Sequence, residues 1–256
     1  IPAYNEENRL PKTLLSIVEY FQDRSIRHQI IVVDDGSTDG TAKVVHGFER
    51  LSPNVRLLRY EQNRGKGYAV RTGMLSAKGR YALYNDADGA TPIAEIERLL
   101  EAVQAGAEIV IGSRAMFSRE TAVTTVWYRK FMGRVFNATV NFLILPGIAD
   151  TQCGFKLFSR DTAQYVFSRQ SAERFSFDVE VLFIARKAGF RIVEVPINWV
   201  NVPGSKVDLV RDSIAMLLDV HETGRREEFA HRVGLIVAMF QPELPPWPQM
   251  TRGIRD

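Results

Sequence analysis

Apolar runs alternate with amphipathic stretches over the first 114 residues of the chain. Residues 30–33, 55–60 and 80–84 are short runs rich in aliphatic and aromatic side chains. One helical face is predicted from the spacing of Leu10, Leu14, Ile17, Val18 and Phe21. Five strands with helices between them are expected before residue 115, with residues 1–4 as the tail of a first strand that upstream residues would extend. This alternation predicts an α/β fold with a mostly parallel sheet.

Polar clusters follow these predicted strands directly. They are residues 34–37, 63–67, 85–89 and 112–114. Helices are expected from the 63–67 cluster to about residue 77 and from Pro92 to about residue 105. Because ligands bind at the carboxyl ends of parallel strands, we expect the clusters to converge in space.

Asp86 and Asp88 place two carboxylates two residues apart at the end of a predicted buried strand. Such a pair can hold one hard divalent cation, with the diphosphate of a nucleotide completing the coordination. The tripeptide alone is equally compatible with a turn that closes the strand, since Asp and Gly are ordinary turn residues.

The cluster at Asp34 and Asp35 is poorly suited to phosphate, because adjacent acids repel it, and better suited to accepting hydrogen bonds from a base or ribose. Residues 63–67 offer Lys66, Arg64 and flexible glycine backbone at a helix start, which is a natural anion site. A plain strand-to-helix turn with a capped helix remains the alternative for both clusters.

A basic and aromatic segment extends from residue 114 to residue 136. It contains Arg114, Arg119, Arg129, Lys130 and Arg134, interleaved with Phe117, Trp127, Tyr128, Phe131, Met132 and Phe136. That combination suits an anionic membrane surface or a lipid phosphate. An amphipathic core helix with a solvated basic face is the alternative. Farther on, Asp178 lies in an alternating apolar and acidic stretch, where it would be either a base of raised pKa or a charge-paired structural group.

Composition narrows these possibilities. A formal net charge of +3 argues against a protein that coats nucleic acid, so no nucleic-acid partner is expected. The single cysteine, Cys153, is expected to be a small buried residue, and the four histidines are expected at the surface, in no metal-like spacing. The longest uncharged run, residues 135–149, is too short to span a bilayer.

Several motifs occur together in one order. They are Pro2-Ala3-Tyr4-Asn5-Glu6-Glu7, Val33-Asp34-Asp35-Gly36-Ser37-Thr38-Asp39-Gly40-Thr41, Asn63-Arg64-Gly65-Lys66-Gly67, Asp86-Ala87-Asp88, Asp150-Thr151-Gln152-Cys153-Gly154-Phe155-Lys156, Phe177-Asp178-Val179-Glu180, Asn198-Trp199 and Gly204-Ser205-Lys206. In this order the chain resembles the family 2 glycosyltransferases with a GT-A fold. The later motifs resemble the branch of dolichyl-phosphate β-glucosyltransferases, with dolichol-phosphate mannose synthases as relatives. The resemblance covers residues 1–210, expected to be the GT-A domain, and leaves residues 211–256 as a C-terminal helical tail.

The resemblance implies a role for each matching residue. Pro2, Ala3, Tyr4, Glu6 and Asp35 would surround the nucleotide, with Asp34, Lys66 and Asp86 close to it. Asp86 and Asp88 would bear Mg²⁺ or Mn²⁺, and Arg114 and Arg129 would hold the acceptor lipid phosphate. Asp178 and Asp150 are candidates for a base or for orienting an arginine.

The predicted reaction is a single displacement that inverts the anomeric centre. The phosphate oxygen of a polyprenyl or dolichyl phosphate would attack the sugar of a nucleotide-bound donor. The expected donor is UDP-glucose. Rival predictions are a GDP-mannose-using transferase, a nucleotidyltransferase and a catalytically silent nucleotide-binding protein. The predicted location is peripheral, on the cytoplasmic face of a membrane.

Overall fold

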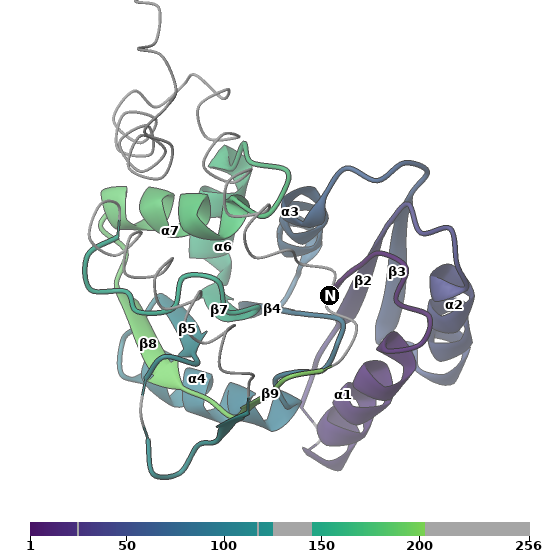
Figure 1. The fold of residues 1–256 in the computed structure, drawn as a ribbon, viewed down its shortest axis with the longest axis horizontal. Coiled ribbons are helices and arrows are strands. Elements are labelled where there is room, and N and C mark those ends of the chain that lie inside the picture. Colours follow the sequence, from purple (N-terminus) through teal and green to yellow (C-terminus); the bar gives the residue numbers. More distant parts are fainter. Residues whose placement is uncertain (25, 117, 125–144, 203–256) are drawn as a thin grey trace, which may run out of the picture.

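A computed structural model describes residues 1–24, 26–116, 118–124 and 145–202 (Figure 1). The helices are α1 (Leu10–Arg24), α2 (Thr41–Leu51), α3 (Lys66–Ser76), the 3₁₀ helix η1 (Ile93–Glu95), α4 (Ile96–Gln104), α6 (Arg160–Arg169) and α7 (Phe177–Lys187). The strands are β1 (Pro2–Ala3), β2 (Ile30–Asp35), β3 (Val55–Tyr60), β4 (Tyr81–Asn85), β5 (Ile109–Ser113), β6 (Val123–Thr124), β7 (Phe155–Ser159), β8 (Ile192–Pro196) and β9 (Trp199–Val200).

The described strands form two main sheets and one short pair. In the first sheet β1, β2 and β3 run parallel in that order, with Ile30 opposite Val55 and Asp35 opposite Tyr60. The second sheet has the order β4-β7-β5-β8, and β7 runs antiparallel to both of its neighbours. The α/β class and the five predicted strands are confirmed, whereas the antiparallel strand was not foreseen.

Strand β7 escaped the sequence analysis because a lysine interrupts its apolar run. Phe155, Leu157 and Phe158 are buried in the core, as expected for a central strand, but Lys156 is equally buried. A charged side chain in such a position needs partners inside the protein. Those partners come from other elements and are described with the site below.

The helices lie on both sides of the strands. Helices α3, α6 and α7 pack together on one side, and α4 lies on the other (Figure 1). Helix α1 shares the side of α4, because the Tyr20 hydroxyl donates a hydrogen bond to Glu97 at 2.8 Å. The helix predicted from Pro92 begins instead as η1, and its α-helical part starts at Ile96.

A cavity of about 700 Å³ separates the two main sheets. It is lined by Ile30, Ile31 and Val33 of β2, by all of β4, and by apolar side chains of α1 and α3. Neither Asp86 nor Asp88 lines it. The cavity therefore lies beside β2 and β4, apart from Asp86 and Asp88, and opens to the surface near the exposed Ile26.

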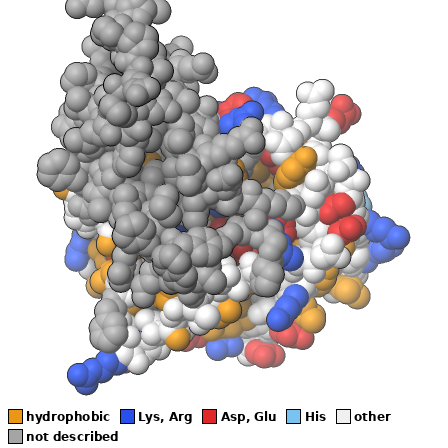
Figure 2. Space-filling model, viewed as in Figure 1, with side chains coloured by type: hydrophobic (Ala, Val, Ile, Leu, Met, Phe, Trp, Pro, Cys, Tyr) orange, Lys and Arg blue, Asp and Glu red, His pale blue; other side chains and the backbone are white. Residues whose placement is uncertain are grey.

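Two predicted regions fall outside the described residues. They are most of the basic and aromatic segment, including Arg129, and the whole predicted tail of residues 211–256. On the face shown in Figure 2, acidic and basic side chains are interspersed over the described part of the surface. No helix within the described ranges is both long enough and apolar enough to cross a membrane.

Candidate functional site

The polar clusters after β2 and β3 meet as predicted. The Asp35 carboxylate accepts hydrogen bonds from the backbone N–H groups of Arg64 at 2.8 Å and Gly65 at 2.7 Å. Both of its oxygens are thus used to hold the loop that starts α3. A nucleotide contact through Asp35 stays a prediction, and what the geometry gives directly is an anchor for the loop that carries Lys66.

Asp34 is fully buried, and its carboxylate stabilises the turn that follows it. One oxygen accepts from the Ser37 N–H at 3.0 Å, and the other lies 3.3 Å from Nε of Arg59. Ser37 in turn accepts a hydrogen bond from the backbone of Asn5 at 2.9 Å. The acidic turn therefore fixes the loop after β1 in place.

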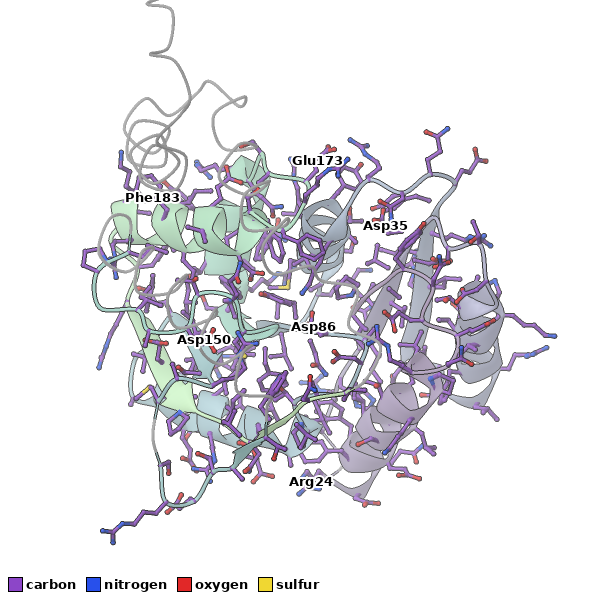
Figure 3. The ribbon with its side chains drawn as sticks, viewed as in Figure 1. Arg24, Asp35, Asp86, Asp150, Glu173 and Phe183 are labelled. Carbon is purple, nitrogen blue, oxygen red and sulfur yellow. The ribbon has the colours of Figure 1, made fainter. Side chains whose placement is uncertain are left out.

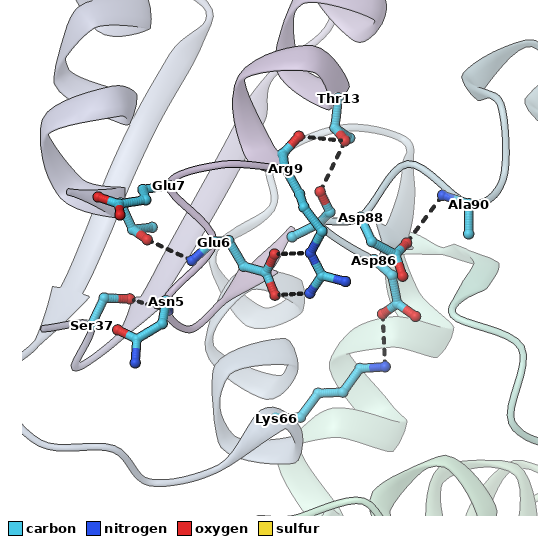
Figure 4. A network of polar contacts seen from close by, with 12 residues as sticks. Asn5, Glu6, Glu7, Arg9, Thr13, Ser37, Lys66, Asp86, Asp88 and Ala90 are labelled. Atoms are coloured by element: carbon cyan, nitrogen blue, oxygen red, sulfur yellow. Dashed lines mark hydrogen bonds and ion pairs between the residues drawn. The ribbon is translucent and has the colours of Figure 1, made fainter. Parts of the chain in front are cut away.

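That loop carries the other predicted nucleotide-binding residues. Pro2 and Ala3 form β1, Tyr4 is exposed, and the backbone N–H of Glu6 donates to the Thr41 hydroxyl at 2.7 Å. The Glu6 carboxylate forms an ion pair with Arg9 (Figure 4). The hydrogen bond between the Arg9 side chain and the Glu6 carboxylate raises the pKa of Arg9. The charges of Asp88 and Asp86 raise it as well. The loop is therefore close to the paired acids.

Asp86 follows β4 and faces the start of α3. Nζ of Lys66 lies 2.7 Å from Oδ1 of Asp86, so the strand end and the helix start are joined by an ion pair (Figure 4). Burial alone would lower the pKa of Lys66, but the charge of Asp86 opposes this effect and the pKa is raised. Lys66 is therefore a charged group beside Asp86, where a diphosphate would need positive charge.

The second acid, Asp88, accepts a hydrogen bond from the Ala90 N–H at 3.0 Å. Burial and the neighbouring charge of Asp86 raise the pKa of Asp88. Two carboxylates whose charges repel in this way fit a divalent cation, which would relieve the repulsion. In the described ranges no group of three or more His, Cys, Asp or Glu side chains is arranged to hold a metal. Phosphate oxygens of a ligand and water molecules would complete the coordination of a cation held by this pair.

Arg114 and Asp150 form a bidentate ion pair at the end of β5. Asp150 is labelled in Figure 3. Nε of Arg114 lies 2.7 Å from Oδ2 of Asp150, and Nη2 lies 2.8 Å from Oδ1. The Arg114 backbone N–H also donates to Asp150 at 2.9 Å. Of the two roles considered for Asp150, orienting an arginine is the one that this geometry supports.

The pKa values of both partners are shifted by their burial and by each other's charge. Burial would raise the pKa of Asp150, but the adjacent Arg114 guanidinium outweighs it and the pKa is lowered. Burial would likewise lower the pKa of Arg114, whereas the charge of Asp150 raises it. The Trp199 ring also lies 5.6 Å from Cζ of Arg114. Arg114 is thus a fixed cation with 31% of its side chain still exposed.

Asp178 has different partners from those expected. Its carboxylate lies 2.5 Å from Nζ of Lys156 and accepts a hydrogen bond from the Tyr84 hydroxyl. It is buried, as are Lys156 and Tyr84. Its role as a base stays a prediction, but in the structure it is charge-paired with a lysine and not with an arginine.

The loop between α6 and α7 holds the start of α3 from the other side. The carbonyl oxygen of Glu173 accepts from the Tyr68 N–H at 2.9 Å, and Arg64 pairs with the Glu173 side chain at 2.7 Å. Glu180 fixes this loop by accepting hydrogen bonds from the backbone of Ser171 and Ala172. The segment that presents Lys66 is therefore clamped between β2 and the loop before α7.

A substitution of Gly67 tests how tightly the start of α3 packs against this loop, because no side chain larger than hydrogen fits there. A Cβ at Gly67 would lie 2.6 Å from the Ala172 carbonyl oxygen and 2.8 Å from Cβ of Phe177. We expect Gly67→Ala to lower the free energy of unfolding by about 1–3 kcal/mol, the usual cost of overpacking. Urea unfolding would measure it. The matched control is Gly47→Ala in α2, where no atom lies within 4 Å and alanine favours the helix. Equal stability of the two variants would contradict the tight packing.

Some site residues were missed by the sequence analysis. Lys156, Tyr84 and Arg9 were not singled out, and only the position of Lys156 within an apolar run offered a signal. Cys153 is buried as expected, and burial raises the pKa of its thiol to about 12. Arg129 lies outside the described residues, so the structure is silent on its predicted phosphate contact.

Solved structures with the same architecture define the class of the fold. Glucosyl-3-phosphoglycerate synthase from Mycobacterium tuberculosis, in complex with Mn²⁺, UDP-glucose and phosphoglyceric acid, has a TM-score of 0.61 at 18% identity, covering 91% of this chain and 78% of that chain. Mannosyl-3-phosphoglycerate synthase from Rubrobacter xylanophilus has a TM-score of 0.59 at 20% identity, covering 88% and 73%. The fold is that of the GT-A glycosyltransferases.

Sequence comparison identifies the family. The glycosyl transferase family 2 profile matches residues 1–167, and the chain belongs to this family. A dolichyl-phosphate β-glucosyltransferase of Dictyostelium discoideum is 40% identical over 234 residues, which is 86% of this chain and 71% of the relative. The Homo sapiens enzyme of that name is 40% identical over 220 residues, 81% of this chain and 68% of the relative. The Saccharomyces cerevisiae enzyme is 36% identical over 238 residues, covering 86% and 71%.

Proposed function

We propose that this chain is an inverting glucosyltransferase that moves glucose from UDP-glucose to a polyprenyl phosphate such as dolichyl phosphate. The observation that carries the proposal is the agreement between relatives of that name, 36–41% identical over at least 68% of their length, and the site. The site offers paired acids at Asp86 and Asp88 after β4, Lys66 at the start of α3, and the fixed cation Arg114 after β5 of the same sheet as β4.

The proposed reaction is one displacement at the anomeric carbon. A phosphate oxygen of the acceptor forms the new bond while the bond to the UDP diphosphate breaks, which inverts the configuration. The acceptor phosphate is already ionised at neutral pH, so it needs little help from a general base. The proposal therefore requires neither Asp178 nor Asp150 to remove a proton.

Bringing two anions together is the main task of the protein in this reaction. Arg114, held by Asp150, would attract the acceptor phosphate, and Lys66 would neutralise part of the donor diphosphate. Asp86 and Asp88 would hold Mg²⁺ or Mn²⁺, which as a Lewis acid stabilises the charge of the departing diphosphate. Arg129 is proposed as the second cation for the acceptor phosphate.

A lipid-linked acceptor implies work at a membrane surface. The proposal includes a peripheral position on the cytoplasmic face of a membrane, supported by the basic and aromatic composition of residues 114–136. Binding to vesicles that contain anionic lipid, compared with neutral vesicles, tests this part separately from catalysis.

A transfer assay tests donor and acceptor together. Labelled UDP-glucose and labelled GDP-mannose are each supplied with Mn²⁺, with and without polyprenyl phosphate. We expect label in the lipid fraction only with UDP-glucose and polyprenyl phosphate. Transfer from GDP-mannose alone would overturn the glucosyl assignment, and pyrophosphate release from a nucleoside triphosphate would indicate a nucleotidyltransferase.

A further inference from the structure

Lys156 is a buried cation whose hydrogen-bonding capacity is fully used. Its Nζ lies 2.7 Å from the Tyr84 hydroxyl oxygen, 2.7 Å from the Cys153 carbonyl oxygen and 2.5 Å from Oδ1 of Asp178. An ammonium group has three donors, so these contacts account for all of them. Lys156 thereby joins β7 to β4, to α7 and to the turn that precedes β7.

Stability alone is a weak reason for such an arrangement. Desolvating a lysine and an aspartate costs several kcal/mol per ion, and apolar residues of similar volume are often as stable or more so. The three side chains, Lys156, Tyr84 and Asp178, are here called the buried triad. The triad is distinguished by where its contacts lie. The Tyr84 hydroxyl and the Cys153 carbonyl, both bound by Lys156, belong to segments that touch Asp86.

Asp86 is held between these two segments. On one side Tyr84 precedes it by two residues in the same chain, at the end of β4. On the other side the backbone N–H of Asp86 donates to the Gly154 carbonyl oxygen at 3.0 Å, directly after Cys153. A Cβ added at Gly154 would overlap the Asp86 carboxylate, so this turn forms the wall against which the carboxylate rests.

We propose that the buried triad positions Asp86 for the divalent cation, an inference that rests on the proposed metal role of Asp86. Lys156 holds the Cys153 carbonyl and the Tyr84 hydroxyl at one point, which fixes the turn and the strand end together. The Asp86 carboxylate is then preorganised and does not have to be ordered when the cation and the nucleotide bind. Lys156 and Tyr84 act through Asp86 and contact no reacting atom.

The test replaces the ion pair without leaving a charge unpaired. Lys156→Met combined with Asp178→Leu removes both charges from the core, so the variant should remain folded, as thermal unfolding would show. Mn²⁺ binding in the presence of UDP is measured by electron paramagnetic resonance, independently of turnover. We expect the dissociation constant for Mn²⁺ to rise by about 10- to 100-fold, the usual effect of losing a group that orients a metal ligand.

Tyr84→Phe is a second variant that keeps the ion pair and removes only the hydroxyl, and it should weaken Mn²⁺ binding in the same direction. The matched control is Val45→Ala, a destabilising change at a buried position of α2 that should leave Mn²⁺ binding unchanged. Wild-type Mn²⁺ affinity in both triad variants would overturn the positioning role while leaving the proposed function intact. Failure of the wild type itself to bind Mn²⁺ with UDP would overturn the metal role of Asp86, and the positioning role with it.

Discussion

The Asp88→Asn variant is expected to lose metal-dependent transfer by at least about a hundredfold. The amide keeps the shape of the side chain but removes one of the two negative charges that would hold the cation. A Lewis acid on a departing diphosphate contributes several kcal/mol, and each 1.4 kcal/mol is about a tenfold change in rate. Initial rates of glucose transfer over a range of Mn²⁺ concentrations would measure the loss.

Two controls separate this effect from general damage. Asp161→Asn changes an exposed aspartate in the first turn of α6 and should retain the wild-type rate. Because burial and Asp86 raise the pKa of Asp88, losing its charge should not reduce the melting temperature. Wild-type activity of Asp88→Asn at every Mn²⁺ concentration would remove Asp88 from the proposed metal site.

Asp150→Asn is expected to be the most destabilising of the single substitutions considered. Only 1% of the Asp150 side chain is exposed, and it accepts three hydrogen bonds from Arg114. Breaking a buried pair by removing one partner costs about 3–5 kcal/mol. We expect a loss near the lower limit of about 3 kcal/mol, because 31% of the Arg114 side chain can still reach water. Urea unfolding at neutral pH would measure it.

The pH dependence of this difference follows from the lowered pKa of Asp150. A carboxylate with a lowered folded-state pKa contributes stability that is fully present above its unfolded pKa of about 3.9. That contribution is lost as the pH falls through the folded-state value. The stability gap between wild type and Asp150→Asn should therefore be constant from about pH 5 to pH 7 and shrink below about pH 4. A gap that widens on acidification would contradict the assignment.

The same variant also reports on the acceptor. Arg114 without its carboxylate partner is no longer held in one orientation, so the KM for polyprenyl phosphate should rise more than the KM for UDP-glucose. Glu49→Gln in α2 provides a control distant from the acceptor site. The Glu49 carboxylate accepts a hydrogen bond from the backbone N–H of Leu57. Equal changes in both KM values would argue that Arg114 does not select the acceptor phosphate.

The sequence by itself determined the order of the first five strands and the chemistry at their ends. Alternation of apolar runs with helical periodicity is a local signal. It placed Asp35 at the end of β2, and Asp86 and Arg114 directly after β4 and β5. Because parallel strands share one edge for their carboxyl ends, the meeting of Asp35 with the loop before Lys66 followed from topology alone.

Only the tertiary structure decided which charged groups face one another. Asp150 and Arg114 are 36 residues apart, Lys156 and Tyr84 are 72 apart, and neither pair has a periodicity that links its members. The position of β7 is a similar case, because its central lysine is tolerated only where Asp178 and Tyr84 surround it. Burial makes such partners obligatory, but the chain supplies them from wherever the fold brings them together. Local pattern thus determined the first five strands and the acids at their ends, and long-range pairing determined how those acids are held.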